Sequence, residues 1–347
     1  MKKILFVGHD RGGCNAILPI YRRLADSYQA EVRGVFNEIA KDVVPTDGNA
    51  ISVKPELFGE KELVAEFDAF RPDFVMVGTS EGPTMDKIAT KIAGVRSIPT
   101  ITILDFMGNY EVRFSDPGTT NMKYLPTRIF AINETMVHDM AAVGVPAERI
   151  LVTGNPHFDQ YRVIPMPLAG EGIITFFSQP FSELGKEISF GYDERGILRD
   201  ILEAYASLNL TTQLVIRNHP KTKNKQIFDE MLKESGVNAR VDEAMTTDEA
   251  IAKSSLILGM NSTTLFEAAL VGRPVVSYQP GLSKKDPLIS NSLGLSIAVY
   301  HKKDLAPAIE RALKPEHVAE IQRIRAKLNI DNAAERVLTT LHKLKFL

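Results

Sequence analysis

A loop in the C-terminal half of the chain, GMNSTTLFE at 259–267, has the residue types of an anion-binding helix start. A short apolar run precedes it and a helical pattern follows it, so it joins a strand to a helix. Asn261 or Ser262 can cap that helix, and the N–H groups of its first turn would face a negatively charged ligand. An ordinary solvated cap is the alternative interpretation. The residues that we assign to donor binding here are Asn261, Ser262, Thr263, Thr264 and Glu267, the last through the hydroxyls of a ribose.

A second polar loop, IRNHPK at 216–221, follows another predicted strand of the same half. A diphosphate needs positive charge and hydrogen-bond donors to offset its own charge, above all as a leaving group. Arg217, His219 and Lys221 could supply both, so we assign them to the nucleotide as well. A loop histidine beside solvated lysines is the competing interpretation.

Glycines mark the first loop of the chain, HDRGGCN at 9–15. Gly12 and Gly13 permit close approach of the backbone to a ligand, and we predict that they contact an acceptor substrate beside Asp10. The loop lacks the GxGxxG spacing of dinucleotide-binding folds. The alternative is a tight turn between a strand at 3–8 and a helix at 17–27.

Carboxylates that could act as a general base follow two further strands of the N-terminal half. Asp105 begins DFMGNYEVRF at 105–114, and Glu81 lies in GTSEG at 78–82. Asp105, Asp10 or Glu81 could remove a proton from an acceptor hydroxyl. Arg113 could pair with an anionic group of the acceptor, or form a structural ion pair with Asp105 instead.

The elements that must position these loops form two consecutive series of strands and helices. Continuous apolar, β-branched runs separated by helical patterns predict parallel sheets that are covered on both faces. The predicted strands are 3–8, 31–36, 74–77, 100–104, 129–132, 150–153, 172–177, 213–216, 256–259 and 275–278. Two prolines and two glycines at 163–172 predict a linker between the series. Ligands of such sheets bind beyond the carboxyl ends of the strands, where all these loops lie.

Composition excludes several classes of function. The chain has 347 residues, a formal net charge of -2 and a single cysteine, which argues against a general nucleic-acid binder and excludes an internal disulfide. No apolar run reaches about 18 residues, so we predict a cytoplasmic protein without a transmembrane span. The sequence contains no P-loop, no GxSxG elbow and no clustered His/Cys motif. We therefore expect no cofactor and no metal site.

Three segments carry a resemblance to a known superfamily. NSTTLFEAA at 261–269 with GRPVV at 272–276 resembles the donor-binding segment of GT-B glycosyltransferases, and similar segments occur in UDP-N-acetylglucosamine 2-epimerases and CDP-glycerol glycerophosphotransferases. RNHP at 217–220 resembles the Arg-x-His-Pro element that holds the nucleotide diphosphate in glycerophosphotransferases and polysialyltransferases. TGNPHFD at 153–159 resembles the Gly-Asn-Pro-x-x-Asp element that ends the first domain in this superfamily.

The chain also departs from these families. Epimerases carry Ser-Gly-Gly-x-x-Glu-Glu, and of that acidic pair only Glu267 is present here. Glycerophosphotransferases carry a His-Gly element in the N-terminal half, where this sequence reads Asp105-Phe106-Met107-Gly108. Asp105 would then take the place of the histidine as the base.

The resemblance implies an α/β protein of the GT-B type, with two Rossmann-like domains whose parallel sheets face an interdomain cleft. The acceptor domain would be 1–162 and the nucleotide-donor domain 172–328, with a C-terminal helix at 329–347 crossing back to the first. The implied activity is metal-independent transfer of a glycosyl or related group from a UDP- or CDP-linked donor to a glycan or polyol hydroxyl, in surface-glycan biosynthesis. A nucleotide-sugar 2-epimerase or hydrolase and a non-catalytic ligand-binding or scaffold protein remain open. So do a peripheral contact with the inner face of the membrane and a homodimer.

Overall fold

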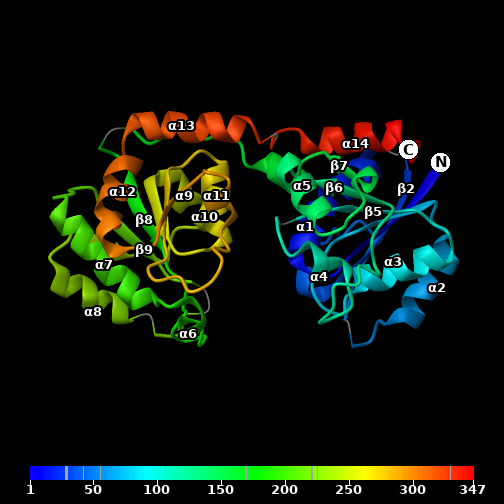
Figure 1. Cartoon of the computed structure of the whole chain (residues 1–347), viewed down its shortest axis with the longest axis horizontal. Helices are drawn as coiled ribbons and strands as arrows, with labels where there is room; N and C mark the ends of the chain where they lie inside the picture. The colour runs from blue at the N-terminus through cyan, green and yellow to red at the C-terminus, as the bar shows by residue number, and fades with distance from the viewer. Residues whose placement is uncertain are drawn as a thin grey trace. The chain divides into compact units, whose positions relative to one another are not determined.

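The computed structural model describes residues 1–27, 30–41, 43–54, 56–105, 107–168, 170–219, 222–224, 226–328 and 330–347. Within them the chain divides into two compact units, one formed by Met1–Gln160 with Leu328–Leu347 and the other by Tyr161–Lys327. Each unit is built on one sheet whose strands all run parallel (Figure 1).

The first unit contains a seven-stranded sheet in the order β3-β2-β1-β4-β5-β6-β7. Its strands are β1 (Lys2–Gly8), β2 (Ala30–Asn37), β3 (Ala50–Val53), β4 (Phe74–Val77), β5 (Thr100–Ile103), β6 (Arg128–Ala131) and β7 (Ile150–Val152). Its helices are α1 (Arg11–Ser27), η1 (Glu38–Ala40), α2 (Glu60–Phe70), α3 (Met85–Val95), α4 (Tyr110–Phe114), α5 (Glu134–Ala142), η2 (Ala147–Arg149), η3 (Pro156–Gln160) and α14 (Ala333–Lys343).

The second unit contains a six-stranded sheet in the order β10-β9-β8-β11-β12-β13. Its strands are β8 (Ile173–Phe177), β9 (Leu214–Arg217), β10 (Ala239–Val241), β11 (Ser254–Gly259), β12 (Val275–Tyr278) and β13 (Ile297–Val299). Its helices are α6 (Glu187–Phe190), α7 (Glu194–Ser207), α8 (Gln226–Ser235), α9 (Thr247–Lys253), α10 (Thr263–Leu270), α11 (Ile289–Ser292), η4 (Lys302–Asp304), α12 (Leu305–Ala312) and α13 (Pro315–Ala326).

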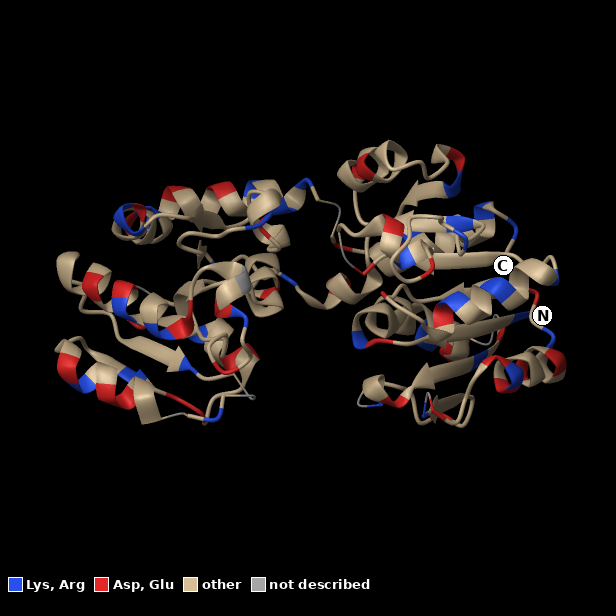
Figure 2. Ribbon diagram, turned by 60° about the horizontal axis from the view of Figure 1, so that its bottom comes forward, with Lys and Arg blue, Asp and Glu red and all other residues tan. Residues whose placement is uncertain are grey.

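Strand β1 explains why the predicted apolar runs are continuous. Ile4 and Phe6 belong to a core that includes α1, whereas Leu5 and Val7 belong to a second core with α2 and α3. Successive side chains enter opposite faces of the sheet, so a strand buried on both faces needs apolar residues at every position. Figure 2 shows the result: acidic and basic residues lie mainly on helices and loops, and the strands are largely uncharged.

The C-terminal helix α14 completes the core on the α1 face of the first sheet. Val337 and Leu341 are buried in the same core cluster as strand β1. The carboxylate of Asp159 accepts hydrogen bonds from the backbone N–H groups of Ala333 at 2.7 Å and Ala334 at 2.9 Å. A negative charge is favourable at this end of a helix. The Asp of the Gly-Asn-Pro-x-x-Asp-like element therefore anchors the last helix of the chain.

Two features differ from the sequence prediction. The pattern does not predict β3, β10 and β13, which are edge strands of only four, three and three residues. Helix α1 begins at Arg11 rather than at 17, so Gly12 and Gly13 lie in its first turn and not in a loop. Among the described residues, none of the helices combines the length and the apolar character needed to cross a membrane.

Both sheets follow the same winding order. Strand order reverses between β1 and β4 in the first unit, and between β8 and β11 in the second. In open parallel sheets, ligands bind beyond the carboxyl ends of the strands at such a reversal. Each unit therefore has its own expected binding edge.

Candidate functional site

The candidate bases of the first unit follow the adjacent strands β1, β4 and β5. Asp10 follows β1, Glu81 lies in the loop after β4, and Asp105 lies just beyond β5. Because these strands are parallel neighbours, their loops emerge at one edge of the sheet, beside the reversal in strand order. The fold thus brings the three carboxylates to the same end of the first unit.

Asp105 is held by a buried ion pair with Arg113. Nη1 of Arg113 donates to Oδ1 of Asp105 at 2.7 Å, and the Thr79 hydroxyl donates to the same oxygen at 2.9 Å. The side chains of Arg113 and Asp105 are 8% and 15% exposed. Burial raises the pKa of Asp105, and the positive charge of Arg113 opposes that rise. The structural ion pair that we weighed against anion binding by Arg113 is therefore present.

The glycines of α1 make room for these groups. A Cβ atom at Gly12 would overlap Oδ2 of Asp105, and a Cβ atom at Gly13 would lie 2.9 Å from the backbone nitrogen of Thr79. Asp10 fixes the same turn, because its Oδ1 accepts a hydrogen bond from the Gly13 N–H at 2.7 Å. The space that Gly12 and Gly13 leave by lacking a side chain is thus filled by Asp105 and by the backbone of Thr79. Contact of Gly12 and Gly13 with an acceptor stays a prediction.

Two more titratable side chains flank Asp10. Nδ1 of His9 lies 3.2 Å from Nδ2 of Asn37 and accepts the Met85 N–H at 3.4 Å. The Asn37 amide also lies 3.4 Å from Nε2, so only the Met85 N–H identifies Nδ1 as the acceptor and favours a proton on Nε2. Burial lowers the pKa of His9 against the opposing charge of Asp10. Cys14 is fully buried, and burial together with nearby carboxylates raises the pKa of its thiol. It is a packed thiol and not a reactive thiolate.

Lys87 ties the loops after β4 and β5 to helix α3. Its Nζ donates at 2.8–3.0 Å to three backbone carbonyls, those of Gly82, Val112 and Ser115. The Lys87 side chain is buried, and burial lowers its pKa. Beside it, Oε1 of Glu81 accepts a hydrogen bond from Nδ2 of Asn109 at 2.8 Å. These contacts fix both loops relative to each other.

Asp86 is a buried carboxyl that no motif in the sequence singles out. It lies in the first turn of α3, it is 3% exposed, and neither of its oxygens has a partner at hydrogen-bond geometry among the described residues. Its own backbone N–H and the Ser80 hydroxyl lie near enough to oppose the rise in its pKa. Burial raises the pKa of Asp86 to about 7, and the charges of Asp10 and Asp105 act in the same direction. In the sequence, Asp86 is marked only by being an acidic residue in the first helical turn after the loop that contains Glu81. In the described ranges, no three His, Cys, Asp or Glu side chains are arranged to hold a metal ion.

In the second unit, helix α10 starts directly after β11, at the reversal in strand order. Ser262 is its N-cap: Oγ of Ser262 accepts the Thr264 N–H at 3.2 Å, and its carbonyl accepts the Leu265 N–H at 3.0 Å. Of the two caps that the sequence offered, Ser262 is therefore the one used. The positive end of the α10 dipole lies at the carboxyl edge of the sheet.

A chain of polar side chains fixes the residue before that cap. The Asn261 N–H donates to Oε1 of Gln179 at 3.1 Å, and Nδ2 of Asn261 donates to Oη of Tyr192 at 3.1 Å. Oη of Tyr192 donates to Oε1 of Gln279 at 3.0 Å, and Nε2 of Gln279 donates to Asp286 at 2.9 Å. Of these residues, only Asn261 is predicted from the sequence. Gln279 is the first residue after β12 and Gln179 is the second after β8. A glutamine just beyond an apolar strand is a pattern that could have found both.

Arg217 is the last residue of β9, and His219 lies two residues beyond it. Nη1 of Arg217 donates to the carbonyl of Asp242 at 2.8 Å and lies 3.5 Å from Oδ1 of Asp242, so this guanidinium has an internal acidic partner. The carbonyl of His219 accepts the Thr222 N–H at 2.8 Å.

The two predicted donor loops share one edge of the second sheet. His219 follows β9 and Ser262 follows β11, and these strands flank β8 on either side. Because all strands are parallel, the two loops leave the sheet in the same direction. Lys221, which we assigned to the nucleotide, and the preceding Pro220 lie outside the described residues.

Several solved structures have the same architecture. UDP-GlcNAc 2-epimerase from Neisseria meningitidis, bound to UDP-GlcNAc, matches with a TM-score of 0.72 and 17% identity, over 98% of this chain and 100% of that one. The glycotransferase of kitacinnamycin matches with a TM-score of 0.65 and 15% identity, over 98% of both chains. MurG from Acinetobacter baumannii matches with a TM-score of 0.61 and 13% identity, over 99% and 100%. No protein-family model and no curated protein sequence matches the chain.

These likenesses, with the two parallel sheets, establish that the chain has the GT-B fold. The predicted α/β class with two Rossmann-like units is confirmed. At these low identities the likeness concerns the fold, and the activity has to be argued from the residues.

Proposed function

We propose that the chain is a glycosyltransferase, or a related glycerophosphotransferase, that moves a group from a nucleotide-diphosphate donor to an acceptor hydroxyl. The observation that carries this proposal is the Ser262-capped start of α10 at the strand-order reversal of the second sheet. Nucleotide phosphates bind at helix starts in this position because N–H groups and the helix dipole favour negative charge.

The donor would bind the second unit. The α10 start and His219 would offset the charge of the diphosphate, and Glu267 would accept hydrogen bonds from the ribose. The guanidinium of Arg217 is bound to Asp242. Arg217 would therefore position the loop after β9 and would not contact the diphosphate directly. The similar structures of UDP-GlcNAc 2-epimerase from Neisseria meningitidis and of MnaA from S. aureus hold UDP-GlcNAc and UDP, respectively, which supports a UDP-linked donor.

The acceptor would bind the first unit, with Asp105 as the favoured base. Its Oδ1 is fixed by Arg113 and Thr79, which orients Oδ2 toward Gly12. The acceptor hydroxyl would give its proton to Asp105 as its oxygen attacks the donor carbon or phosphorus. The bond to the nucleotide would break, and the leaving group would carry its electron pair to the α10 start.

A nucleotide-sugar 2-epimerase is the second candidate. The similarity to UDP-GlcNAc 2-epimerase over nearly the full length of both chains favours it. The two candidates differ in one requirement, because an epimerase or hydrolase changes the donor without an acceptor. Incubation with UDP-GlcNAc alone, followed by product analysis, would therefore separate them: an isomerised or hydrolysed sugar would favour the second candidate.

Nucleotide binding is the first test of either activity. A thermal-shift screen against UDP, CDP, GDP, CMP and their sugar forms should raise the melting temperature with at least one ligand, by mass action. His219→Ala should reduce that shift. His342→Ala, which removes an exposed histidine from α14 of the first unit, is the matched control and should not. No shift with any nucleotide at millimolar concentration would defeat the proposal.

A further inference from the structure

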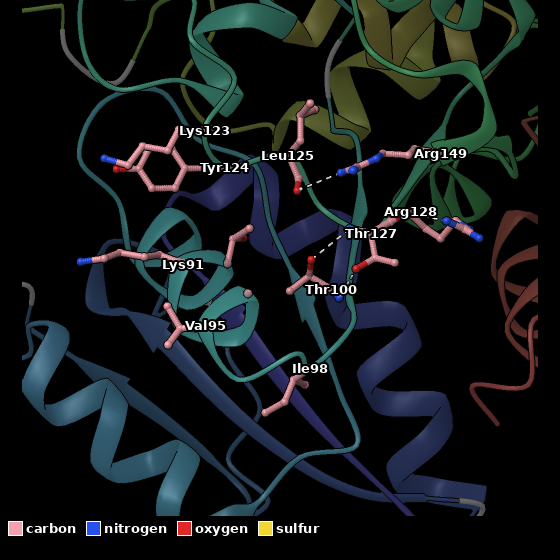
Figure 3. A pocket seen from close by; sticks show the side chains of 12 residues that line it. Lys91, Val95, Ile98, Thr100, Lys123, Tyr124, Leu125, Thr127, Arg128 and Arg149 are labelled. Carbon is pink, nitrogen blue, oxygen red and sulfur yellow. Dashed lines mark hydrogen bonds between the residues drawn. The ribbon is translucent and has the colours of Figure 1, made fainter.

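A pocket of about 370 Å³ opens in the first unit (Figure 3). Its lining includes Thr100 and Arg128, which are the first residues of β5 and β6, and the last turns of α3 with Lys91 and Val95. The candidate bases follow the carboxyl ends of the strands, so this pocket lies at the opposite, amino edge of the same sheet. It is therefore a different site.

The lining of this pocket is positively charged. Four cationic side chains line it, and none of its twelve described lining residues is acidic; the cations are Lys91, Lys123, Arg128 and Arg149. The chain as a whole has 41 basic and 43 acidic residues. The concentration of positive charge is thus a local feature and does not follow from composition.

Little acidic charge offsets these cations. Lys91 pairs with Glu60 at 2.9 Å and Lys123 pairs with Asp116 at 3.3 Å, but both pairs lie at the surface, where such pairs contribute little. Figure 3 shows the two lysines on one side of the pocket and Arg149 reaching toward Leu125 from the other.

Among the residues that the structure describes, the two arginines donate only to backbone carbonyls. Arg128 donates to the carbonyl of Thr127 at 2.8 Å, and Arg149 donates to the carbonyl of Pro126 at 3.1 Å. Across the described ranges, neither guanidinium has a carboxylate within ion-pair distance. Their charge remains available to an anion, and guanidinium groups suit phosphate oxygens in particular.

The rest of the pocket is rigid and partly apolar. The hydroxyls of Thr100 and Thr127 each accept the backbone N–H of the other, at 3.1 and 3.0 Å, which fixes the chain between β5 and β6. Val95, Ile98 and Leu125 supply apolar surface. A preformed, partly apolar pocket of this volume with several polar groups is typical of small-ligand sites.

We propose that this pocket binds a phosphate-bearing small molecule, as a second ligand site separate from the donor site of the second unit. The phosphate would contact the arginines and lysines, and the remainder of the ligand would pack on Val95, Ile98 and Leu125. A soluble phosphorylated compound and the headgroup of an anionic phospholipid share this chemistry, and experiment can tell them apart.

The test compares two double variants that remove the same charge from matched surface positions. K91Q/K123Q removes two pocket lysines whose side chains are 47% and 54% exposed, and R311Q/K314Q removes two cations of the second unit at 58% and 57%. All four residues form surface ion pairs in the native chain. Binding of pyrophosphate and glucose 1-phosphate is measured by calorimetry, and binding to phosphatidylcholine vesicles with and without phosphatidylglycerol by sedimentation.

Wild type should bind at least one probe, and K91Q/K123Q should weaken that binding by about tenfold, because two charge-assisted contacts are lost. R311Q/K314Q should stay within about twofold of wild type. A response to the soluble probes identifies a free metabolite, and a response to the anionic vesicles alone identifies a lipid headgroup. Equal weakening in both double variants, or no binding of any probe, would overturn the proposal.

His219→Ala separates this pocket from the proposed donor site. The pocket should retain its affinity for pyrophosphate in that variant, whether or not the donor site exists. If His219→Ala abolishes all pyrophosphate binding and K91Q/K123Q changes none of it, the anion belongs to the second unit and the pocket proposal is wrong.

Discussion

Nη1 of Arg113 lies 2.7 Å from Oδ1 of Asp105, and the same guanidinium nitrogen donates to the carbonyl of Thr79 at 3.1 Å. One buried cation thus links the loops after β4 and β5 and neutralises the carboxylate between them. The ion pair also orients the carboxylate of Asp105. Arg113 binds Oδ1, so Oδ2 faces Gly12. Oδ2 is the oxygen that we propose takes the proton from the acceptor hydroxyl.

Removing the charge of Arg113 should destabilise the first unit strongly. Arg113→Met leaves Asp105 buried without its counter-ion, which costs about 3–5 kcal/mol of the free energy of unfolding. Denaturant unfolding measures the change. Arg311→Met is the control, because its pair with Glu320 is 58% and 42% exposed and should contribute less than about 1 kcal/mol. Equal losses in the two variants would show that the Asp105 pair has no special energetic role.

Gly12→Ala should be harmful although it adds a good helix former to α1. In an unconstrained helix position this change stabilises by roughly 0.5–1 kcal/mol. At Gly12 the new methyl group would overlap Oδ2 of Asp105, so either the helix start or the carboxylate must move. We expect lower stability and, under the proposed function, lower turnover.

Gly94→Ala provides the matched comparison for Gly12→Ala. Gly94 also lies in a helix, α3, and a Cβ atom there has no neighbour within 4 Å. It should raise the melting temperature slightly. If Gly12→Ala is at least as stable as Gly94→Ala, the structure around Asp105 can accommodate the added methyl group without loss of stability, and this prediction is wrong.

The buried carboxyl of Asp86 should make stability fall as pH rises. Its pKa goes from 3.8 in the unfolded reference to about 7 in the folded chain. Between these values the unfolded chain releases a proton that the folded chain keeps, so the folded state loses relative stability with increasing pH, and the loss is complete above about pH 7. The total is on the order of a few kcal/mol.

Asp86→Asn isolates this effect, because the amide resembles the protonated carboxyl and does not titrate. The free energies of unfolding of the variant and wild type should be closest near pH 4, and the variant should gain on wild type toward pH 8. A difference that is constant over this range would contradict a raised pKa for Asp86.

Periodicity predicts the interior of both sheets because those strands are buried on both faces. KILFVG in β1 needs an apolar residue at each position, and its sequence indicates a strand without any tertiary information. The edge strands β3, β10 and β13 escape prediction because they are short and only partly buried. The start of α1 is also mispredicted, since Gly12 and Gly13 are typical of loops and only their tertiary neighbours explain them.

The positions of the candidate loops are predictable, but the partners of their side chains are not. Polar residues after apolar runs indicate that Asp105, Arg217 and Ser262 follow strands of parallel sheets. The pairing of Arg217 with Asp242 joins residues 25 positions apart through two adjacent strand ends, and no local pattern encodes it. The pair of Asp105 and Arg113 could be suggested as an alternative only because the two residues are just eight positions apart.

Tyr192 should couple the stability of the second unit to its affinity for nucleotide. Its hydroxyl accepts a hydrogen bond from Asn261 and donates one to Gln279, and the side chain is 7% exposed. Tyr192→Phe leaves both amide groups without this partner, which should cost about 1–3 kcal/mol of the free energy of unfolding. Because Asn261 precedes the α10 cap, the variant should also bind nucleoside diphosphate several-fold more weakly, measured by calorimetry.

Tyr205→Phe is the control for this prediction. Tyr205 belongs to the same unit and, like Tyr192, is a buried tyrosine, with 1% of its surface exposed. Its hydroxyl has no hydrogen-bond partner among the described residues. Removing an unpartnered buried hydroxyl should leave stability unchanged or raise it, and nucleotide affinity should not change. If the two phenylalanine variants behave alike in both measurements, the hydrogen-bonded chain through Tyr192 does not position the donor loop.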